Sequence, residues 1–277
     1  MKRIVAILLL NPLSLLGLVL VSAVVCGAVF ADWIAPFPEH RGAVVDFSNF
    51  NQPPNWPYIM GTDLVGRDIF SRILYAYRIS LLLGVVVLVI AVPIGVISGL
   101  AAGYLKGWPS FVIMRITDVF LSIPPLVLAM SMMGLLEPTL INGMLAVTAM
   151  WWPWYTRLVY NVTRAEKQEG YVLAAETLGA STPLILFREI LPNCLPPILT
   201  KMTLDFGFVI LIASSLSFLG LGVQPPTPDL GSMVADGAKY LPDSWWLTVF
   251  PGLAILVAVF GFNLIGDALR DILGAES

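Results

Sequence analysis

The residue types that enzymes use for catalysis are scarce in this chain. Its 277 residues include one histidine, His40, and two cysteines, Cys26 and Cys194. One histidine excludes an HExxH site and any cluster of imidazole metal ligands, and nothing beside His40 resembles a nucleophile elbow. We therefore expect no catalytic residue and no metal site on this chain, and we interpret His40 as a solvated loop residue.

The sequence features of a nucleotide site are also missing. Two glycine-containing segments, Gly61-Thr62-Asp63 and Gly66-Arg67-Asp68, lack the lysine and the preceding strand of a phosphate loop, and the pattern GxxxxGK[ST] does not occur. If ATP drives this protein, another chain must bind the nucleotide.

Acidic residues are placed near the ends of apolar runs rather than at their centres, as Asp118, Asp205 and Asp267 illustrate. Carriers driven by protons or sodium usually place ionisable groups in the middle of the membrane. This placement disfavours a carrier driven by an ion gradient without excluding it.

The spacing in the segment 157–197 indicates contact with a second protein. Residues 169–179 are expected to form a short helix in which Ala174, Ala175 and Leu178 share one face. Small residues at this spacing leave a shallow face onto which another protein can close. Gly179 suits the left-handed turn that ends a helix.

A second short helix is expected directly after this glycine. Thr182 suits its N-cap, Pro183 its first helical position, and Pro192 its end. Two short helices joined at a glycine would make a lever for a moving partner. From spacing alone, the alternative is an ordinary soluble loop between two membrane spans.

The elements that carry this segment are expected to be membrane spans. Hydrophobic residues make up 58% of the chain and charged residues 12%, whereas roughly a quarter of an average soluble domain is charged. The mean hydropathy is +0.86. Six runs reach the length of about 20 apolar residues that a span needs: 4–31, 79–103, 112–136, 138–156, 198–222 and 246–266. The sequence therefore predicts an all-α polytopic membrane protein with about six transmembrane helices, the third broken by Pro124-Pro125.

The topology follows from the flanking charges. The first run is longer than the apolar region of a typical secretory signal, so we expect it to be retained as a span. Ten Lys and Arg residues fall on the side that receives both termini, and five fall on the other side. The positive-inside rule then places both termini in the cytoplasm. We expect no disulfide between Cys26 and Cys194, and a net charge of −3 without a basic stripe predicts no nucleic-acid partner.

Several further residues are assigned from their surroundings. Residues 67–77 are expected to form a helix at the membrane interface, or else a folded external loop that packs on the spans. Trp245 and Trp246 are expected in the interfacial aromatic belt. The following side chains are candidates for lining a translocation path, although small polar residues also let helices pack closely: Ser214, Ser215 and Ser217.

Two charge pairs are expected near the cytoplasmic ends of spans, Asp118 with Arg115 and Asp267 with Arg270.

The segment 169–192 resembles the EAA coupling motif of permeases in bacterial ATP-binding-cassette (ABC) importers. The matching residues are Ala174, Ala175, Gly179, Ile190, Leu191 and Pro192. The chain departs from the motif at Leu173, where that family usually has a glutamate. Glu169 and Glu176 are the nearby candidates for supplying this charge.

The resemblance covers about Gly61 to Asp271 and is specific to the C-type permeases of the dipeptide, oligopeptide and nickel branch. It is carried by these blocks: Gly61-Thr62-Asp63, Gly66-Arg67-Asp68, Ser71-Arg72, Arg78-x-Ser80-Leu81, Ser217 to Pro228, Phe250 to Ala254 and Phe262 to Asp271. One further departure is Leu230, where relatives commonly carry tryptophan.

The resemblance implies a type I importer permease that pairs with a homologous B-type permease around a shared translocation path. It also implies two ATP-binding subunits that hold the ATP and magnesium, an extracytoplasmic substrate-binding protein, and the plasma membrane of a bacterium or archaeon. The cargo would be a peptide or a related small solute. The implied ATPase-coupling residues are Glu169, Tyr171, Ala174, Ala175, Gly179, Ser181, Arg188 and Pro192. The alternative is a secondary transporter or channel that works alone.

We therefore expect three regions. Residues 1–78 would form the first transmembrane helix and an external loop with the interfacial helix, and residues 79–271 the permease domain with five helices. The coupling loop would occupy about 164–197 of that domain, and residues 272–277 would be a C-terminal tail.

Overall fold

A computed structural model describes residues 11–274, and they are almost entirely helical or loop. Within this range no strand forms beyond a single bridge between Thr62 and Asp68. The longer helices are α2 (Pro12–Val29), α4 (Ile69–Tyr104), α5 (Trp108–Ser122), α7 (Leu140–Glu166), α10 (Leu191–Phe218) and α12 (Trp246–Gly274). The shorter ones are α3 (Ala31–Ile34), η1 (Pro38–Arg41), η2 (Phe47–Asn49), α6 (Pro125–Met133), α8 (Gly170–Thr177), α9 (Thr182–Leu184), η3 (Ile185–Ile190) and α11 (Leu230–Ala238). The all-α prediction is confirmed.

By length and composition, fewer helices qualify as membrane spans than the six predicted. In the described range, four helices are long and apolar enough to cross a membrane: α2, α4, the continuous helix Thr182–Phe218, and α12. Helices α5 and α6 make a fifth if they count as one span, bent by 88° at the predicted Pro124-Pro125 break. The predicted fourth run lies in α7, whose tryptophans, proline and arginines lower its hydropathy.

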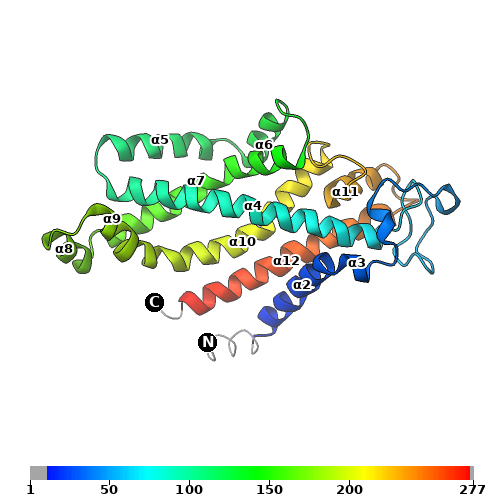
Figure 1. Ribbon diagram of the computed structural model, residues 1–277, viewed down its shortest axis with the longest axis horizontal. Helices are drawn as coiled ribbons and strands as arrows, with labels where there is room; N and C mark the ends of the chain where they lie inside the picture. The colour runs from blue at the N-terminus through cyan, green and yellow to red at the C-terminus, as the bar shows by residue number, and fades with distance from the viewer. Residues whose placement is uncertain (1–10, 275–277) are drawn as a thin grey trace.

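The long helices run alongside one another in an elongated bundle (Figure 1). Helix α4 packs against α7 and α10, while α12 packs against α10 and α2. Helices α8 and α9 lie at one end of the bundle, and α11 with the loop after α3 lies at the opposite end (Figure 1). The N-terminal end of α2 and the C-terminal end of α12 both point toward the α8 end (Figure 1).

Helices α4 and α7 pack together along a row of glycines that are four residues apart on α4. A Cβ atom built on Gly99 would lie 2.7 Å from the Thr156 carbonyl oxygen, and one on Gly103 would lie 2.6 Å from the Thr163 Cβ. Gly95 faces Tyr155 in the same way. Small residues at this spacing let two helix backbones approach closely, which is how membrane helices gain packing energy.

The helix that enters the fifth predicted run does not stop at Pro192, so that prediction was wrong. Helices α9, η3 and α10 form one continuous helix from Thr182 to Phe218. The segment η3 is a π-helix, and the Leu191 N–H donates to the carbonyl of Leu186, five residues back. A proline ring clashes with the carbonyl four residues before it, and a π-turn is a known way to insert the extra residue that relieves such a clash.

The loop between α3 and α4, which the predicted topology places outside and which we name the outer loop, is folded against the bundle and corrects two predictions. His40 is buried, and its Nδ1 accepts a 2.7 Å hydrogen bond from the Asp68 N–H. Trp246 is also buried and donates from Nε1 to the Thr62 carbonyl at 3.3 Å. We expected the first ring in water and the second at the membrane interface. Each is instead hydrogen-bonded to a backbone group far away in the chain.

A separate interfacial helix over residues 67–77 is not formed. The helix that begins at Ile69 continues to Tyr104 as α4, and Ile73, Leu74 and Tyr77 are all buried. Asp68 caps it by accepting from the Ser71 N–H at 2.7 Å. The alternative expectation, a folded external loop that packs on the spans, holds only as far as Asp68, because residues 69–77 are the first turns of α4.

Candidate coupling and translocation sites

Helix α8 ends in a Schellman motif built on the predicted glycine. Gly179 has a φ of +78°, a left-handed conformation that costs glycine little. Its N–H donates to the Glu176 carbonyl at 3.0 Å, and the Ala180 N–H donates to the Ala175 carbonyl at 3.0 Å. These are the two bonds of that motif. A Cβ atom on Gly179 would have no neighbour within 4 Å, so this corner is open.

The two faces of α8 differ sharply in exposure. Val172 is fully buried, and Ala175 packs against the same apolar core. On the other side, Leu173 is 50% exposed and Leu178 is 87% exposed. Ala174 is exposed with these leucines, which splits the alanine pair that we placed on one face. An apolar face on a short helix outside the bundle is the kind of surface that a partner protein covers.

Tyr171 joins α8 to its two flanking helices. Its hydroxyl donates to the Glu166 carboxylate of α7 and accepts from Asn193 Nδ2 of α10 at 2.8 Å. Burial, followed by the hydrogen bond to Glu166, raises the pKa of Tyr171 to about 12. The phenol therefore stays protonated at neutral pH and keeps its role as a donor.

The remaining predicted coupling residues lie on the same end of the molecule. Glu169 is the exposed N-cap of α8, with no side-chain capping bond, and Ser181 is the exposed N-cap of α9. Arg188 lies exposed in η3, and Pro192 lies exposed in the first turn of α10. The helix after the glycine begins one residue earlier than predicted, since Ser181 and not Thr182 takes the N-cap position.

Glu176 and Glu169, the two candidates for the missing motif charge, have different surroundings. Glu169 makes no side-chain hydrogen bond or ion pair within residues 11–274, and its side chain is free to face a partner. Glu176 accepts a 2.7 Å hydrogen bond at Oε1 from the hydroxyl of Tyr104 at the end of α4. Of the two, Glu169 is the carboxylate that another protein can reach without breaking an internal bond.

The three candidate path serines do not share one surface. Ser214 and Ser215 line a groove of about 330 Å³ whose other walls are mostly apolar and include Leu211, Phe218 and Ile255. A second groove of about 400 Å³ continues along α10 and α12 and shares Leu211 and Ile255 with the first. Ser217 is buried and lines neighbouring cavities beside α11 instead.

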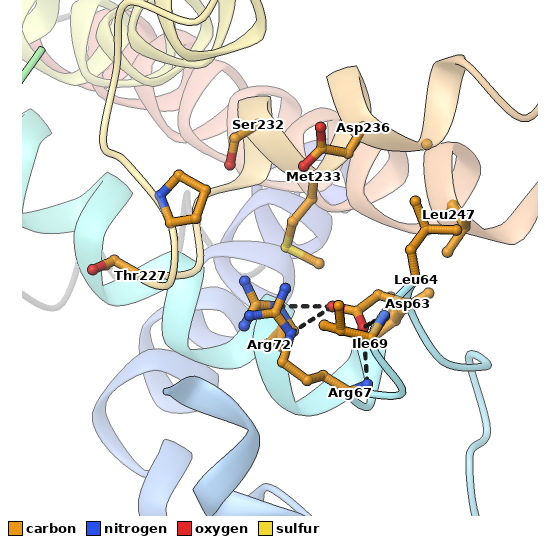
Figure 2. A pocket seen from close by; sticks show the side chains of 13 residues that line it. Asp63, Leu64, Arg67, Ile69, Arg72, Thr227, Ser232, Met233, Asp236 and Leu247 are labelled. Carbon is orange, nitrogen blue, oxygen red and sulfur yellow. Dashed lines mark hydrogen bonds and ion pairs between the residues drawn. The ribbon is translucent and has the colours of Figure 1, made fainter. Parts of the chain in front are cut away.

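A charged pocket of about 240 Å³ lies at the outer end, between the start of α4 and α11. Figure 2 shows Arg67 and Arg72 meeting Asp63 on one wall, with Asp236 of α11 on the other. Arg67 pairs with Asp63 at 2.7 Å. Arg72 is buried and donates to the His40 carbonyl at 3.0 Å. These bonds fasten the outer loop to the bundle.

Other charged groups pair between and within helices. Asp118 of α5 contacts Arg115 at 3.6 Å, as predicted, and also pairs with Arg157 of α7. The predicted pair of Asp267 and Arg270 was wrong: the ion pairs formed within residues 11–274 do not include it, and both residues face outward.

The sequence reading missed a buried ion pair inside the bundle. Asp205 is 5% exposed, and its Oδ1 accepts from Lys201 Nζ at 3.0 Å. Lys201 Nζ also lies 5.5 Å from the ring centre of Tyr155 on α7. The i, i+4 spacing of Lys201 and Asp205 was the available signal for this pair.

Two family models match this chain. Residues 91–276 match the family described as binding-protein-dependent transport system inner membrane component. Residues 1–54 match the N-terminal transmembrane domain of oligopeptide transport permease C.

Individual relatives extend over almost the whole chain. It is 41% identical over 267 residues to the probable D,D-dipeptide transport system permease protein DdpC of Escherichia coli, covering 96% of this chain and 89% of that protein. It is 39% identical over 270 residues to the di/tripeptide transport system permease protein DppC of Pseudomonas aeruginosa, covering 95% and 88%.

A solved structure supports the fold. An inward-facing structure of the MetNI methionine ABC transporter matches 73% of this chain and 93% of its own, with a TM-score of 0.56 and 19% identity. The chain therefore belongs to the family of binding-protein-dependent transport system inner membrane components, as a multi-pass, C-type permease subunit of an ABC importer.

Proposed function

We propose that this permease carries peptides or related small solutes, and that its energy comes from ATP hydrolysed on partner subunits. Relatives named as dipeptide and di/tripeptide permeases, matched over at least 95% of this chain, support the cargo class. The absence of a phosphate-loop sequence supports the placement of ATP and magnesium on other chains. This chain is then a transport subunit and not itself an enzyme.

The exposed apolar face of α8 is the observation that carries the proposal. Leu173 and Leu178 stand out from the end of the bundle, on a helix whose other face is anchored by buried Val172. One of two ATP-binding subunits docks on this face and on the open corner at Gly179. Around that face we assign docking to these remaining coupling residues: Glu169, Tyr171, Ala174, Ser181, Arg188 and Pro192. The other predicted coupling residue, Ala175, packs against the core and supports α8 from its buried face.

The α8 end of the bundle is cytoplasmic in this account, and so are both termini. The helix ends at Pro12 and Gly274 point to the α8 end (Figure 1). Ten of the fifteen Lys and Arg residues belong to that side, as the positive-inside rule requires of the cytoplasm. The membrane is the plasma membrane of a bacterium or archaeon.

The translocation path lies along the two grooves between α10 and α12. A homologous B-type permease covers them, so that Ser214 and Ser215 face a shared path. The groove walls are mostly apolar, which suits solutes that differ in side chain. An extracytoplasmic binding protein delivers the solute at the opposite end, beside the outer loop and α11.

Transport follows from a shift between two arrangements of the subunits. ATP must bind better to the arrangement in which the ATP-binding subunits are closed. Their closure displaces α8, and the continuous helix Thr182–Phe218 carries this displacement from the docking site toward the path. Hydrolysis resets the arrangement.

Reconstitution with one component left out at a time tests the function. The chain is purified with its partner permease, the ATP-binding subunits and the binding protein, and uptake into vesicles is measured. We expect uptake to require the ATP-binding subunits and hydrolysable ATP. Uptake by this chain alone would establish the alternative, a stand-alone carrier or channel, for which the buried Asp205 would be the first ion-coupling candidate.

A binding screen on the extracytoplasmic partner identifies the cargo. We expect it to bind short peptides or a related small solute. Binding restricted to an unrelated class, such as sugars, would contradict the cargo assignment while leaving the permease role intact.

A further inference from the structure

The coupling helix α8 is attached to the bundle by a side-chain bond to a helix that does not flank it. The hydroxyl of Tyr104, the last residue of α4, donates to Glu176 Oε1 at 2.7 Å across 72 positions of sequence. The end of α4 is also bonded by Lys167, the C-cap residue of α7, which belongs to a helix that flanks α8. The bond therefore adds a direct link from the docking helix to α4.

Tyr104 is held firmly enough to act as the fixed side of this link. Its side chain is buried, at 8% exposure. The ammonium group of Lys167 lies 4.2 Å from the centre of its ring and also donates to its backbone carbonyl. A cation over the face of a phenol ring is attracted to it, which helps to hold the Tyr104 ring in place.

The other attachments of α8 reach different helices. Tyr171 bonds to Glu166 at the end of α7 and to Asn193 in α10. Both of those helices are already connected to α8 by short stretches of chain. If the Tyr104–Glu176 bond were lost, α8 would keep its links to α7 and α10 and would lose its direct link to α4.

We propose that Tyr104 and Glu176 are positioning residues that transmit the displacement of α8 to α4. The inference rests on the proposed function, in which an ATP-binding subunit moves α8. The glycine seam locks α4 to α7 over several turns, so a pull on Tyr104 moves two helices as a unit. Glu176 then serves this internal bond, and the docking contact with the ATP-binding subunit falls to the Leu173 and Leu178 face.

Three variants and a matched control test this role in the reconstituted complex. Tyr104→Phe removes only the donor, Glu176→Ala removes the acceptor, and Glu176→Gln keeps an acceptor oxygen. Tyr160→Phe removes a hydroxyl from the neighbouring α7 that, among residues 11–274, bonds only to Arg164, at 3.3 Å. The readouts are co-purification of the ATP-binding subunits, ATP turnover, and solute imported per ATP hydrolysed.

We expect Tyr104→Phe and Glu176→Ala to retain the ATP-binding subunits and their ATP turnover. Solute imported per ATP should fall by about tenfold, the effect of losing one hydrogen bond to a charged group. The double variant should be no worse than either single one, because both changes break the same bond. Glu176→Gln and Tyr160→Phe should import close to the wild-type amount per ATP.

Two results would overturn the inference. One is a wild-type import ratio in both Tyr104→Phe and Glu176→Ala. The other is loss of the ATP-binding subunits in Glu176→Ala, which would make Glu176 a docking contact. As a first control, uptake by the wild type is measured with the ATP-binding subunits left out. Uptake in that control would contradict the proposed function itself, so failure of the proposed function can be told from failure of this inference.

Discussion

Asp68, the N-cap of α4, is a carboxylate on which burial and hydrogen bonding act in opposite directions. It accepts from the Ser71 N–H at 2.7 Å and from the Ser71 hydroxyl at 2.6 Å, which favours the ionised form. Burial has the larger effect and raises the pKa of Asp68 above its ordinary value of 3.8. Its second oxygen, Oδ1, has no partner among the described residues.

The raised pKa of Asp68 determines how its contribution to folding stability changes with pH. A carboxyl group with a raised folded-state pKa stabilises the fold less as the pH rises through the window above 3.8. Asp68→Asn keeps an N-cap acceptor and cannot ionise. We expect the thermal midpoint of the wild type to fall relative to that of Asp68→Asn as the pH rises above 3.8. A relative rise of the wild type over this range would contradict the burial argument.

The ion pair of Lys201 and Asp205 predicts an asymmetry between single and double replacements. Lys201→Met leaves the Asp205 carboxylate buried without a partner and should cost about 3 kcal/mol, the low end for buried pairs, because the lysine side chain is 28% exposed. Lys201→Met with Asp205→Leu removes both charges and should recover most of that loss. Thermal unfolding of the purified complex measures both. A double variant less stable than the single one would show that the pair does more than neutralise its own charges.

Single residues were predicted from sequence where their chemistry is local. The left-handed Gly179 and the pairing of Asp118 with Arg115 depend on neighbours within four positions, and both were foreseen. The predictions for His40 and Trp246 were wrong because each ring is buried and hydrogen-bonded to a backbone group far away in the chain, at Asp68 and Thr62 respectively. No local pattern reports such a contact.

At the scale of elements, the close contact between α4 and α7 along Gly95, Gly99 and Gly103 gives a prediction about stability. Gly99→Ala would place a Cβ 2.7 Å from the Thr156 carbonyl oxygen and should destabilise the protein by about 1–3 kcal/mol, as overpacking does. Gly143→Ala on α7 is the matched control, because its Cβ would have no neighbour within 4 Å. That control should change stability by no more than about 1 kcal/mol, in the stabilising direction, since alanine favours helix.

The midpoints of thermal unfolding of the two variants are compared in the same lipid or detergent. Equal stability of Gly99→Ala and Gly143→Ala would mean that the two helices do not approach as closely as the seam requires.

The docking corner at the end of α8 gives a second prediction for an element. Gly179→Arg should leave membrane insertion intact but abolish the coupling of ATP turnover to uptake, because its side chain would fill the corner that the partner covers. Gly179→Ala carries the same left-handed backbone penalty without the bulk, and it should retain uptake. Wild-type uptake by a well-expressed Gly179→Arg complex would rule out this corner as the docking site.

Elements were foreseen where periodicity and length decide them, and missed where tertiary packing does. The apolar runs located α2, α4 and α12, and the break between α5 and α6 followed from Pro124-Pro125. Pro192 predicted a helix end, but the helix passes through a π-helical segment just before this proline and continues to Phe218. The expected interfacial helix was wrong because its polar residues, such as Arg72, are satisfied by the outer loop and not by water.

At the scale of the whole molecule, the two ends of the bundle differ in structure. One end holds α8 with its exposed leucines, and the other holds a folded outer loop fastened by Arg67, Arg72 and Asp63. The family and its fold were recognisable from ordered sequence blocks. The cargo was not, because the groove along α10 and α12 is mostly apolar and its few polar groups single out no solute.

The central claim is that partner ATP acts on this permease through the exposed face of α8. Cross-linking from Leu178→Cys in intact membranes tests it most directly, with both native cysteines, Cys26 and Cys194, replaced by serine. Ile59→Cys, 48% exposed in the outer loop, is the control. We predict that Leu178→Cys cross-links to an ATP-binding subunit, with a yield that changes on adding ATP, and that Ile59→Cys does not. Two results in a complex that imports solute normally would contradict the account. One is that Leu178→Cys is labelled only from outside the membrane, and the other is that it forms no cross-link to an ATP-binding subunit.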